Sequence, residues 1–270
     1  MSYETPHKKY LNLVKITSGL SGKRVLEVGG STPPSIVRAY APAGWESVNL
    51  DREAVENFNK QAQCLGISAY SAVCSDIATV EKADAYDLVY SINAFEHIHH
   101  LDVALNQMFR ALKKGGHLFT LFGPIWSSDV GHHLSICTDD GRELHFLQGI
   151  LAPWEHLTST RGAIYVKLAA LYGEKTAQRA VTYIYDYADL NRLVEREYLE
   201  IVKKSGFSRV LVMRNRQGRA PNIPGATNTR EFLMILKKGS VTRFQKGACF
   251  TKFALEYGRQ EIAKRLQHLV

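Results

Sequence analysis

The 270-residue sequence predicts an α/β fold in which helices cover both faces of a mostly parallel, seven-stranded sheet. Two observations support this prediction. Short apolar runs alternate with helix-length segments over residues 20–125, which is typical of parallel strands joined by right-handed helical crossovers. The alternation stops at Gly123 and resumes near residue 188, where two more apolar runs precede a long helical segment. The sheet therefore has five predicted strands before the interruption and two after it.

A sharp turn follows the first predicted strand. Residues 24–28 form a short apolar run that ends in a pair of glycines, which indicates a buried strand and then a tight turn. We expect Ser31 or Thr32 to cap the next helix, because short hydroxyl side chains satisfy free N–H groups at helix starts. Pro33 and Pro34 fit the first turn of that helix, where the N–H that proline lacks would have no partner.

The remaining elements follow from the same alternation of apolar runs and amphipathic segments. In the first half, strands are predicted at 46–50, 69–74, 86–91 and 117–122, with helices at about 53–65 and 101–112. In the second half, strands are predicted at 208–213 and 231–237, with helices at about 189–205 and 241–268. Gly115 and Gly116 are expected to form the turn into the fifth strand.

The interruption between the fifth and sixth strands is too long for an ordinary connection. It runs from 123 to 187 and contains Gly-Pro-Ile-Trp and Pro-Trp clusters together with several histidines. We interpret it as a cap inserted over the ends of the strands after strand five. The chain is thus expected to comprise a sheet domain, residues 1–122 and 188–270, and an inserted substrate cap, residues 123–187.

Charge is distributed unevenly along the chain, which carries a net charge of +8. Residues 201–270 hold 15 Lys and Arg against 3 Asp and Glu, whereas residues 1–200 hold 19 against 23. An anionic partner such as nucleic acid or a membrane surface would explain this asymmetry, and so would a solvated basic face. No apolar run approaches the roughly 20 residues that span a bilayer, and the first residues carry no export signal, so a cytoplasmic location is expected.

Glycine, acidic and polar residues follow each of the first four predicted strands. Ligands of open α/β sheets bind at the carboxyl ends of the strands, so these residues predict a binding site. A carboxylate after the second strand can accept both hydroxyls of a ribose, and one after the third can accept from an adenine amine. The predicted site consists, strand by strand, of Glu27 with Gly29 and Gly30, Asp51, Asp76 with Ile77, and Ser91 with Asn93.

At these positions the chain resembles the class I S-adenosylmethionine-dependent methyltransferases, in particular the methyltransferase type 11-like group. The resemblance covers about residues 20–125. It rests on Val25-Leu-Glu-Val-Gly-Gly30, Asn49-Leu-Asp51, Ser75-Asp76-Ile77, Tyr86-Asp-Leu-Val-Tyr-Ser91, Phe95-Glu-His-Ile98 and Leu112-Lys-Lys-Gly-Gly116.

The resemblance implies a Rossmann-like fold and S-adenosyl-L-methionine as the methyl donor. By this likeness the methionine part lies near Glu27 and the two glycines, the ribose near Asp51, and the adenine near Asp76 and Ile77. The sequence departs from the family where Ser31-Thr32-Pro33 replaces further glycines, which predicts a stiffer loop. The same departure removes the GxGxxG motif that a nicotinamide dinucleotide needs for its pyrophosphate, so a dehydrogenase is disfavoured.

Histidines supply the candidate bases. Methyl transfer to a hydroxyl needs a general base, and histidine is the usual one near neutral pH. His97 occupies the Glu-His position that the family places near the reactive methyl group, and His133 or His132 in the cap could contact the substrate beside Trp126. Further aromatic residues are expected to line the cap: Phe146, Trp154, Tyr183, Tyr185 and Tyr187. No metal is expected, because no carboxylate-rich ligand set stands out.

The predicted function is O-methylation of a small-molecule or glycan-type acceptor, with His97 or His133 as the base. One alternative is an N-methyltransferase acting on nucleic acid, although Ser91-Ile-Asn-Ala94 stands where base-modifying enzymes often have an Asn-Pro-Pro-Tyr-like tetrad. The other is a non-catalytic protein of the same fold that binds partners through its basic C-terminal surface. The sequence leaves the oligomeric state open.

Overall fold

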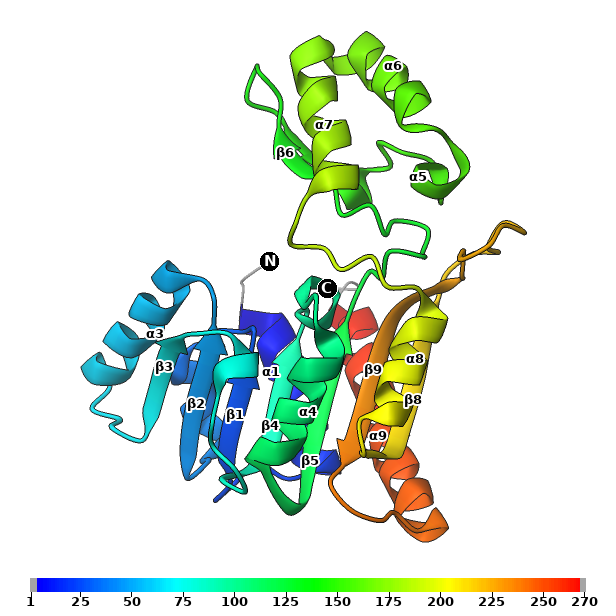
Figure 1. The fold of residues 1–270 in the computed structure, drawn as a ribbon. Helices are drawn as coiled ribbons and strands as arrows, with labels where there is room; N and C mark the ends of the chain where they lie inside the picture. The colour runs from blue at the N-terminus through cyan, green and yellow to red at the C-terminus, as the bar shows by residue number, and fades with distance from the viewer. Residues whose placement is uncertain (1–3, 268–270) are drawn as a thin grey trace.

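The predicted seven-stranded α/β sheet is present in the computed structural model, which describes residues 4–267. The strand order is β3-β2-β1-β4-β5-β9-β8 (Figure 1). The first five strands pair in parallel, and β9 and β8 complete the sheet in antiparallel fashion. The strands are β1 (Arg24–Val28), β2 (Gly44–Asn49), β3 (Tyr70–Cys74), β4 (Tyr86–Ile92), β5 (Leu112–Phe122), β8 (Ser208–Arg216) and β9 (Thr229–Lys237).

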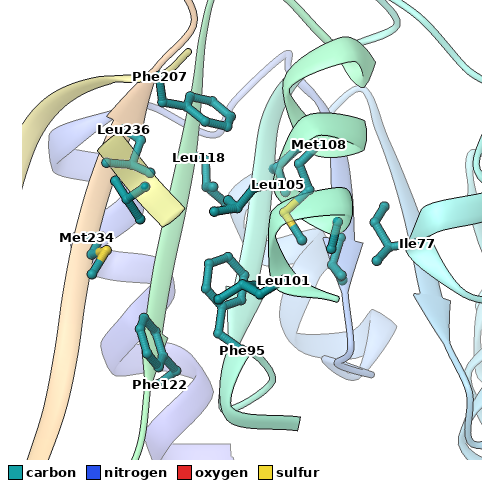
Figure 2. Packing of buried hydrophobic residues seen from close by; sticks show 14 of the residues in the cluster. Ile77, Phe95, Leu101, Leu105, Met108, Leu118, Phe122, Phe207, Met234 and Leu236 are labelled. Atoms are coloured by element: carbon teal, nitrogen blue, oxygen red, sulfur yellow. The ribbon is translucent and has the colours of Figure 1, made fainter. Parts of the chain in front are cut away.

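Helices cover both faces of the sheet because alternate strand residues point to opposite sides. One face packs against α4 (Leu101–Ala111) and α8 (Glu195–Lys204), and Figure 2 shows part of this core. The other face packs against four helices: α1 (Glu4–Thr17), α2 (Pro34–Val37), which continues as η1 (Arg38–Tyr40), α3 (Arg52–Cys64) and α9 (Arg243–Gln267). Two short 3-10 helices follow strands β3 and β4: η2 (Ile77–Thr79) and η3 (Phe95–His97).

The chain between β5 and α8 rises beyond the carboxyl ends of the parallel strands (Figure 1). It has its own buried cluster, in which Leu134, Ile164 and Val181 take part. An ion pair between Asp129 and Arg230 at the start of β9 ties its base to the sheet. Its elements are β6 (Ser135–Cys137), β7 (Glu143–His145), η4 (Phe146–Gln148), α5 (Glu155–Thr158), α6 (Arg161–Tyr172) and α7 (Glu174–Asp186).

The expected cap of the second helix was wrong. Helix α2 begins at Pro34, and the preceding Pro33 makes no side-chain capping bond. The Thr32 hydroxyl instead donates to Glu27 Oε1 at 2.6 Å, and the Ser31 hydroxyl donates to the Gly30 carbonyl at 2.8 Å. A hydrogen bond to a buried carboxylate is stronger than a neutral capping bond, so the Thr32 hydroxyl bonds Glu27 instead of capping the helix.

The fifth strand starts earlier than expected. Leu112 already pairs with Tyr86, and a register shift follows before the regular pairing of His117 with Leu88. Gly115, in the left-handed region at φ +84°, donates its N–H to the Lys238 carbonyl at 2.8 Å. The two glycines therefore make an irregularity inside β5 rather than a turn before it.

No helix in the described part of the chain is long and apolar enough to cross a lipid bilayer.

Truncating Leu105 tests the contribution of the α4 face. This side chain is fully buried in the cluster of Figure 2. We expect Leu105→Ala to lower the free energy of unfolding by about 3 kcal/mol, since the substitution removes apolar contacts and leaves a cavity. Urea titration followed by circular dichroism measures the change. Val103→Ala on the same helix is the control, because Val103 is half exposed, and an equal loss in both variants would contradict the assignment.

Candidate functional site

A cavity of about 860 Å³ opens at the carboxyl ends of the parallel strands. This is the edge where ligands of open α/β sheets bind, and the volume is that of a small-molecule site. Residues from the ends of β1 to β4 line one side, and the segment around the end of α7 lines the other. The cavity therefore lies between the sheet and the chain inserted after β5.

Gly29 forms the wall of the cavity at the end of β1. Its φ of +74° lies in the left-handed region, and a Cβ at this position would collide with the Ala94 side chain. Asn49 of β2 also lines the cavity and holds the loop from the side: its amide donates to the Gly30 carbonyl at 3.3 Å and to Ser31 Oγ at 3.1 Å. The turn therefore needs glycine at position 29. Asn49 was not among the predicted site residues, although it lines the cavity.

Asp51 and Asp76 line the cavity with one carboxylate oxygen each engaged in capping. Asp51 Oδ1 accepts from Ala54 N at 3.1 Å at the start of α3, and Asp76 Oδ1 accepts from Ala78 N at 2.8 Å at the start of η2. Their second oxygens have no protein partner among the described residues and can accept from a ligand. Ile77, which is nearly fully buried, supplies an apolar wall between them and the core. The cavity wall here therefore combines free carboxylate oxygens with an apolar surface.

Glu27 lies behind the loop rather than in the cavity wall. Its buried carboxylate accepts from Thr32 N at 3.0 Å, from Thr32 Oγ1 at 2.6 Å and from Trp45 Nε1 at 2.8 Å. Burial raises the pKa of Glu27, and the hydrogen bonds from Thr32 and Trp45 oppose that rise. Gly30 packs directly on this carboxylate, where a Cβ would come within 2.6 Å of Oε1.

The structure thus separates the predicted cofactor residues into two groups. Ser91, like Glu27 and Gly30, lies outside the cavity lining: it is fully buried and donates to the Val28 carbonyl at 2.9 Å. The roles predicted for all these residues toward the cofactor stay predictions. Of the predicted site residues, those that line the cavity are Gly29, Asp51, Asp76, Ile77, Asn93 and His97.

The ring of His97 is oriented by the chain that returns from α7. Its Nδ1 lies 2.9 Å from the Asp189 carbonyl oxygen, which can only accept, so Nδ1 carries the proton. In the neutral ring the acceptor lone pair therefore belongs to Nε2. Asn191 N donates to the Glu96 carbonyl at 2.9 Å, and the Asn191 amide donates to the Phe95 carbonyl at 2.6 Å, so the same segment also fixes the η3 backbone.

Two tyrosines from the end of α7 face the cavity opposite the strand ends. Tyr183 and Tyr187 both line it, and their rings stack with centroids 4.4 Å apart. A hydrogen bond to Asp189, with burial, raises the pKa of Tyr187 to about 12, so its hydroxyl stays protonated at neutral pH. The sequence indicated these aromatic residues, whereas Asp189 and Asn191 carried no signal, because their contacts with His97, Tyr187 and the η3 backbone exist only in the folded chain.

The other predicted acceptor residues lie inside the inserted segment and outside the cavity lining. Trp126 packs edge-on against His156, with centroids 4.8 Å apart. His132 is 1% exposed, and burial lowers its pKa to about 3. His133 contacts the Pro124 carbonyl, and burial lowers its pKa to about 4. The His133 ring meets that of His97 edge-on, with centroids 5.5 Å apart.

Glu96 is a buried acid that the sequence analysis left without a role of its own. It is 1% exposed, and the Gly123 N–H donates to its Oε1 at 3.1 Å, which joins η3 to the end of β5. Burial raises the pKa of Glu96 to about 8, so the carboxyl is mostly protonated at neutral pH. Within the described part of the chain, no group of three or more His, Cys, Asp or Glu is placed to hold a metal ion.

Comparisons with known proteins identify the class. A methyltransferase domain family model matches residues 6–158. A phthiotriol/phenolphthiotriol dimycocerosates methyltransferase from Mycobacterium leprae (strain TN) is 27% identical over 121 residues, which is 43% of this chain and 44% of that protein. The chain thus aligns with less than half the length of this relative.

Solved structures share the fold. An S-adenosylmethionine-dependent methyltransferase from Mesorhizobium loti has a TM-score of 0.52 and 14% identity, with 85% of this chain and 97% of that chain covered. The geranyl diphosphate C-methyltransferase from Streptomyces coelicolor A3(2), solved with Mg²⁺, geranyl diphosphate and S-adenosyl-L-homocysteine, has a TM-score of 0.55 and 13% identity, with 87% and 77% covered.

The family model spans more than half of the chain, so the protein belongs to this methyltransferase family. This family match agrees with the predicted class of enzyme, for which the sequence implied S-adenosylmethionine as the methyl donor. The match favours the predicted enzyme over the alternative of a non-catalytic binding protein.

Asp51→Ser tests the ribose contact. Serine keeps the α3 cap but lacks the second carboxylate oxygen, so we expect S-adenosylhomocysteine to bind at least about tenfold more weakly with little change in melting temperature. Isothermal titration calorimetry measures the affinity. Asp102→Ser, at an exposed acid outside the cavity, is the matched control. Wild-type affinity in Asp51→Ser would refute the ribose role.

The raised pKa of Glu96 predicts a pH-dependent stability. Between the ordinary glutamate pKa and about 8, the unfolded state ionises while the folded state keeps the proton, so the stability falls as pH rises through this window. Glu96→Gln can keep the Gly123 hydrogen bond and cannot ionise. Between pH 5 and pH 8.5, we expect the free energy of unfolding, measured by urea titration, to fall by up to about 4 kcal/mol less in Glu96→Gln than in the wild type. Parallel pH profiles for the two proteins would contradict this.

Proposed function

We propose that the protein methylates a hydroxyl oxygen of a small-molecule acceptor that binds between His97 and the Tyr183–Tyr187 pair. The orientation of His97 carries this proposal. With its Nδ1 proton engaged by the Asp189 carbonyl, the ring presents Nε2 as a proton acceptor from the wall of the cavity. A hydroxyl acceptor has a high pKa and needs such a base, whereas a neutral amine needs only positioning.

The cavity lining supports the fit of the donor at the strand ends. The free oxygens of Asp51 and Asp76 and the side chain of Ile77 would hold the nucleoside, and Gly29 leaves room beside it. When bound, S-adenosylmethionine supplies an electrophilic methyl group. The task left to the chain is to orient the acceptor and to take its proton at His97 Nε2.

The tyrosine pair defines the acceptor side. Two stacked rings present an apolar surface, which suits an aromatic or sugar-like ring that carries hydroxyls. We assign residues 123–187 as the acceptor cap on this basis, because both tyrosines belong to it. The name of the Mycobacterium leprae relative includes a triol, which supports oxygen as the methylated atom.

Replacing the base tests the proposal. His97→Asn can still donate to the Asp189 carbonyl but cannot accept a proton as imidazole does. We expect kcat to fall by about 100-fold or more while the affinity for S-adenosylhomocysteine changes less than about twofold. The assay measures S-adenosylhomocysteine release with a panel of phenols, sugars and aliphatic alcohols, each paired with the corresponding amine.

His145→Asn, at a partly buried histidine outside the cavity lining, serves as the control. Methylation of the amines alone, or wild-type turnover in His97→Asn, would show that the acceptor atom or the base is wrongly assigned.

A further inference from the structure

Helix α9 presents large apolar side chains to solvent on the face that does not pack on the sheet. Its inner side is buried through Cys249 and Phe253. On its outer side Phe244 is 83% exposed, Leu255 is 70% exposed and Phe250 is 55% exposed. Exposed side chains of this size are costly in water when they gather on one element, and such gathering marks an interaction surface.

Two of these three exposed apolar residues share one side of the helix. Phe244 and Leu255 are eleven residues apart, about three turns at 3.6 residues per turn, so they point in nearly the same direction. Phe250 lies further round the outer surface. Around the helix, the positions between Phe250 and the Phe244–Leu255 side are occupied by Gly247, Thr251 and Ala254. Because these residues are small, the phenylalanine and leucine side chains project furthest into solvent.

Positive charges flank this apolar strip. Lys246 and Lys252 are exposed, and neither has an ion-pair partner within the described part of the chain. Arg243 and Arg259 are also exposed. On α9 up to residue 260, where side chains are described, the one acidic residue is Glu256, which is buried. Over residues 243–260 the outer surface of the helix therefore combines apolar side chains with positive charges.

A groove of about 220 Å³ runs beside the first turns of α9, at the end of the sheet away from the candidate site. Phe244, Val210 and Val241 give it apolar walls, and Lys237 and Lys252 give it positive charge. His117 also lines this groove, and burial, followed by the charges of Lys23 and Lys237, lowers its pKa to about 4.

We propose that α9 and this groove dock the protein on an anionic lipid bilayer. Phe244, Phe250 and Leu255 insert among the acyl chains near the surface, while the lysines meet lipid phosphates. A nucleic acid would use the charges and could stack on phenylalanine, but it would gain nothing from an exposed leucine. A second copy of the chain would bring basic surfaces of like charge together. A protein docked in this way keeps the cavity at the carboxyl ends of the parallel strands open to water.

Vesicle binding by the full chain tests the proposal. In flotation with phosphatidylcholine vesicles that contain phosphatidylglycerol, we expect the protein to bind, with the affinity falling at least about tenfold when the salt is raised to about 0.5 M. Pure phosphatidylcholine vesicles should bind much more weakly. Failure to bind the anionic vesicles would overturn the proposal.

Two double variants locate the surface. Phe244→Ser with Leu255→Ser removes the apolar contacts, and Lys246→Glu with Lys252→Glu reverses the flanking charges. Each is expected to weaken vesicle binding at least about tenfold, with S-adenosylhomocysteine binding and melting temperature retained. The matched controls are Val166→Ser with Leu171→Ser on α6 and Lys60→Glu with Lys175→Glu, all at exposed positions elsewhere. Equal losses in the controls would contradict the assignment to α9.

Two further outcomes would overturn the choice of partner. In one, a fluorescent single-stranded RNA binds more tightly than the anionic vesicles, and the α9 variants abolish that binding. In the other, sedimentation velocity shows a dimer that dissociates in Phe244→Ser with Leu255→Ser. Binding to anionic vesicles that depends on α9, by a monomer that does not prefer RNA, supports the proposal.

Discussion

The carboxylate of Glu27 is the interaction on which the cofactor end of the cavity depends. It receives hydrogen bonds from the loop through Thr32 and from β2 through Trp45, so one buried group joins β1, the loop and the neighbouring strand. A buried carboxylate is tolerated only where such donors satisfy it. The loop that they hold has no glycine at positions 31–33, and side-chain hydrogen bonds from Thr32 together with Pro33 restrict it instead.

The strands and the residues at their ends could be predicted from the sequence because both follow from local patterns. Apolar runs predicted all seven strands of the large sheet. Polar residues directly after β1 to β4 must gather at the carboxyl ends of these parallel strands. Helix α1 was not predicted: its sequence is rich in charge, and Leu11, Leu13 and Val14 are buried only because the sheet and α9 lie beside them. The capping prediction failed for a similar reason, since Thr32 bonds a residue from an earlier strand.

The acceptor end was less accessible because its chemistry comes from tertiary placement. The sequence marked a surplus of histidines but could not rank them. Folding buries His132 and His133 inside the inserted segment and leaves His97 on the cavity wall. His97 combines a place on the cavity wall with a contact between its Nδ1 and the Asp189 carbonyl, 92 positions away along the chain, and no side-chain pattern indicates a carbonyl.

The return segment from α7 to α8 has a mechanical consequence. Asp189 orients the ring of His97, Asn191 fixes the backbone of η3, and Tyr187 stands at the cavity a few residues earlier. A displacement of the inserted segment would therefore disturb the ring of His97 and the Tyr187 side of the cavity together. Under the proposed function, the entry of the acceptor and the orientation of the base would be coupled through this single stretch of backbone.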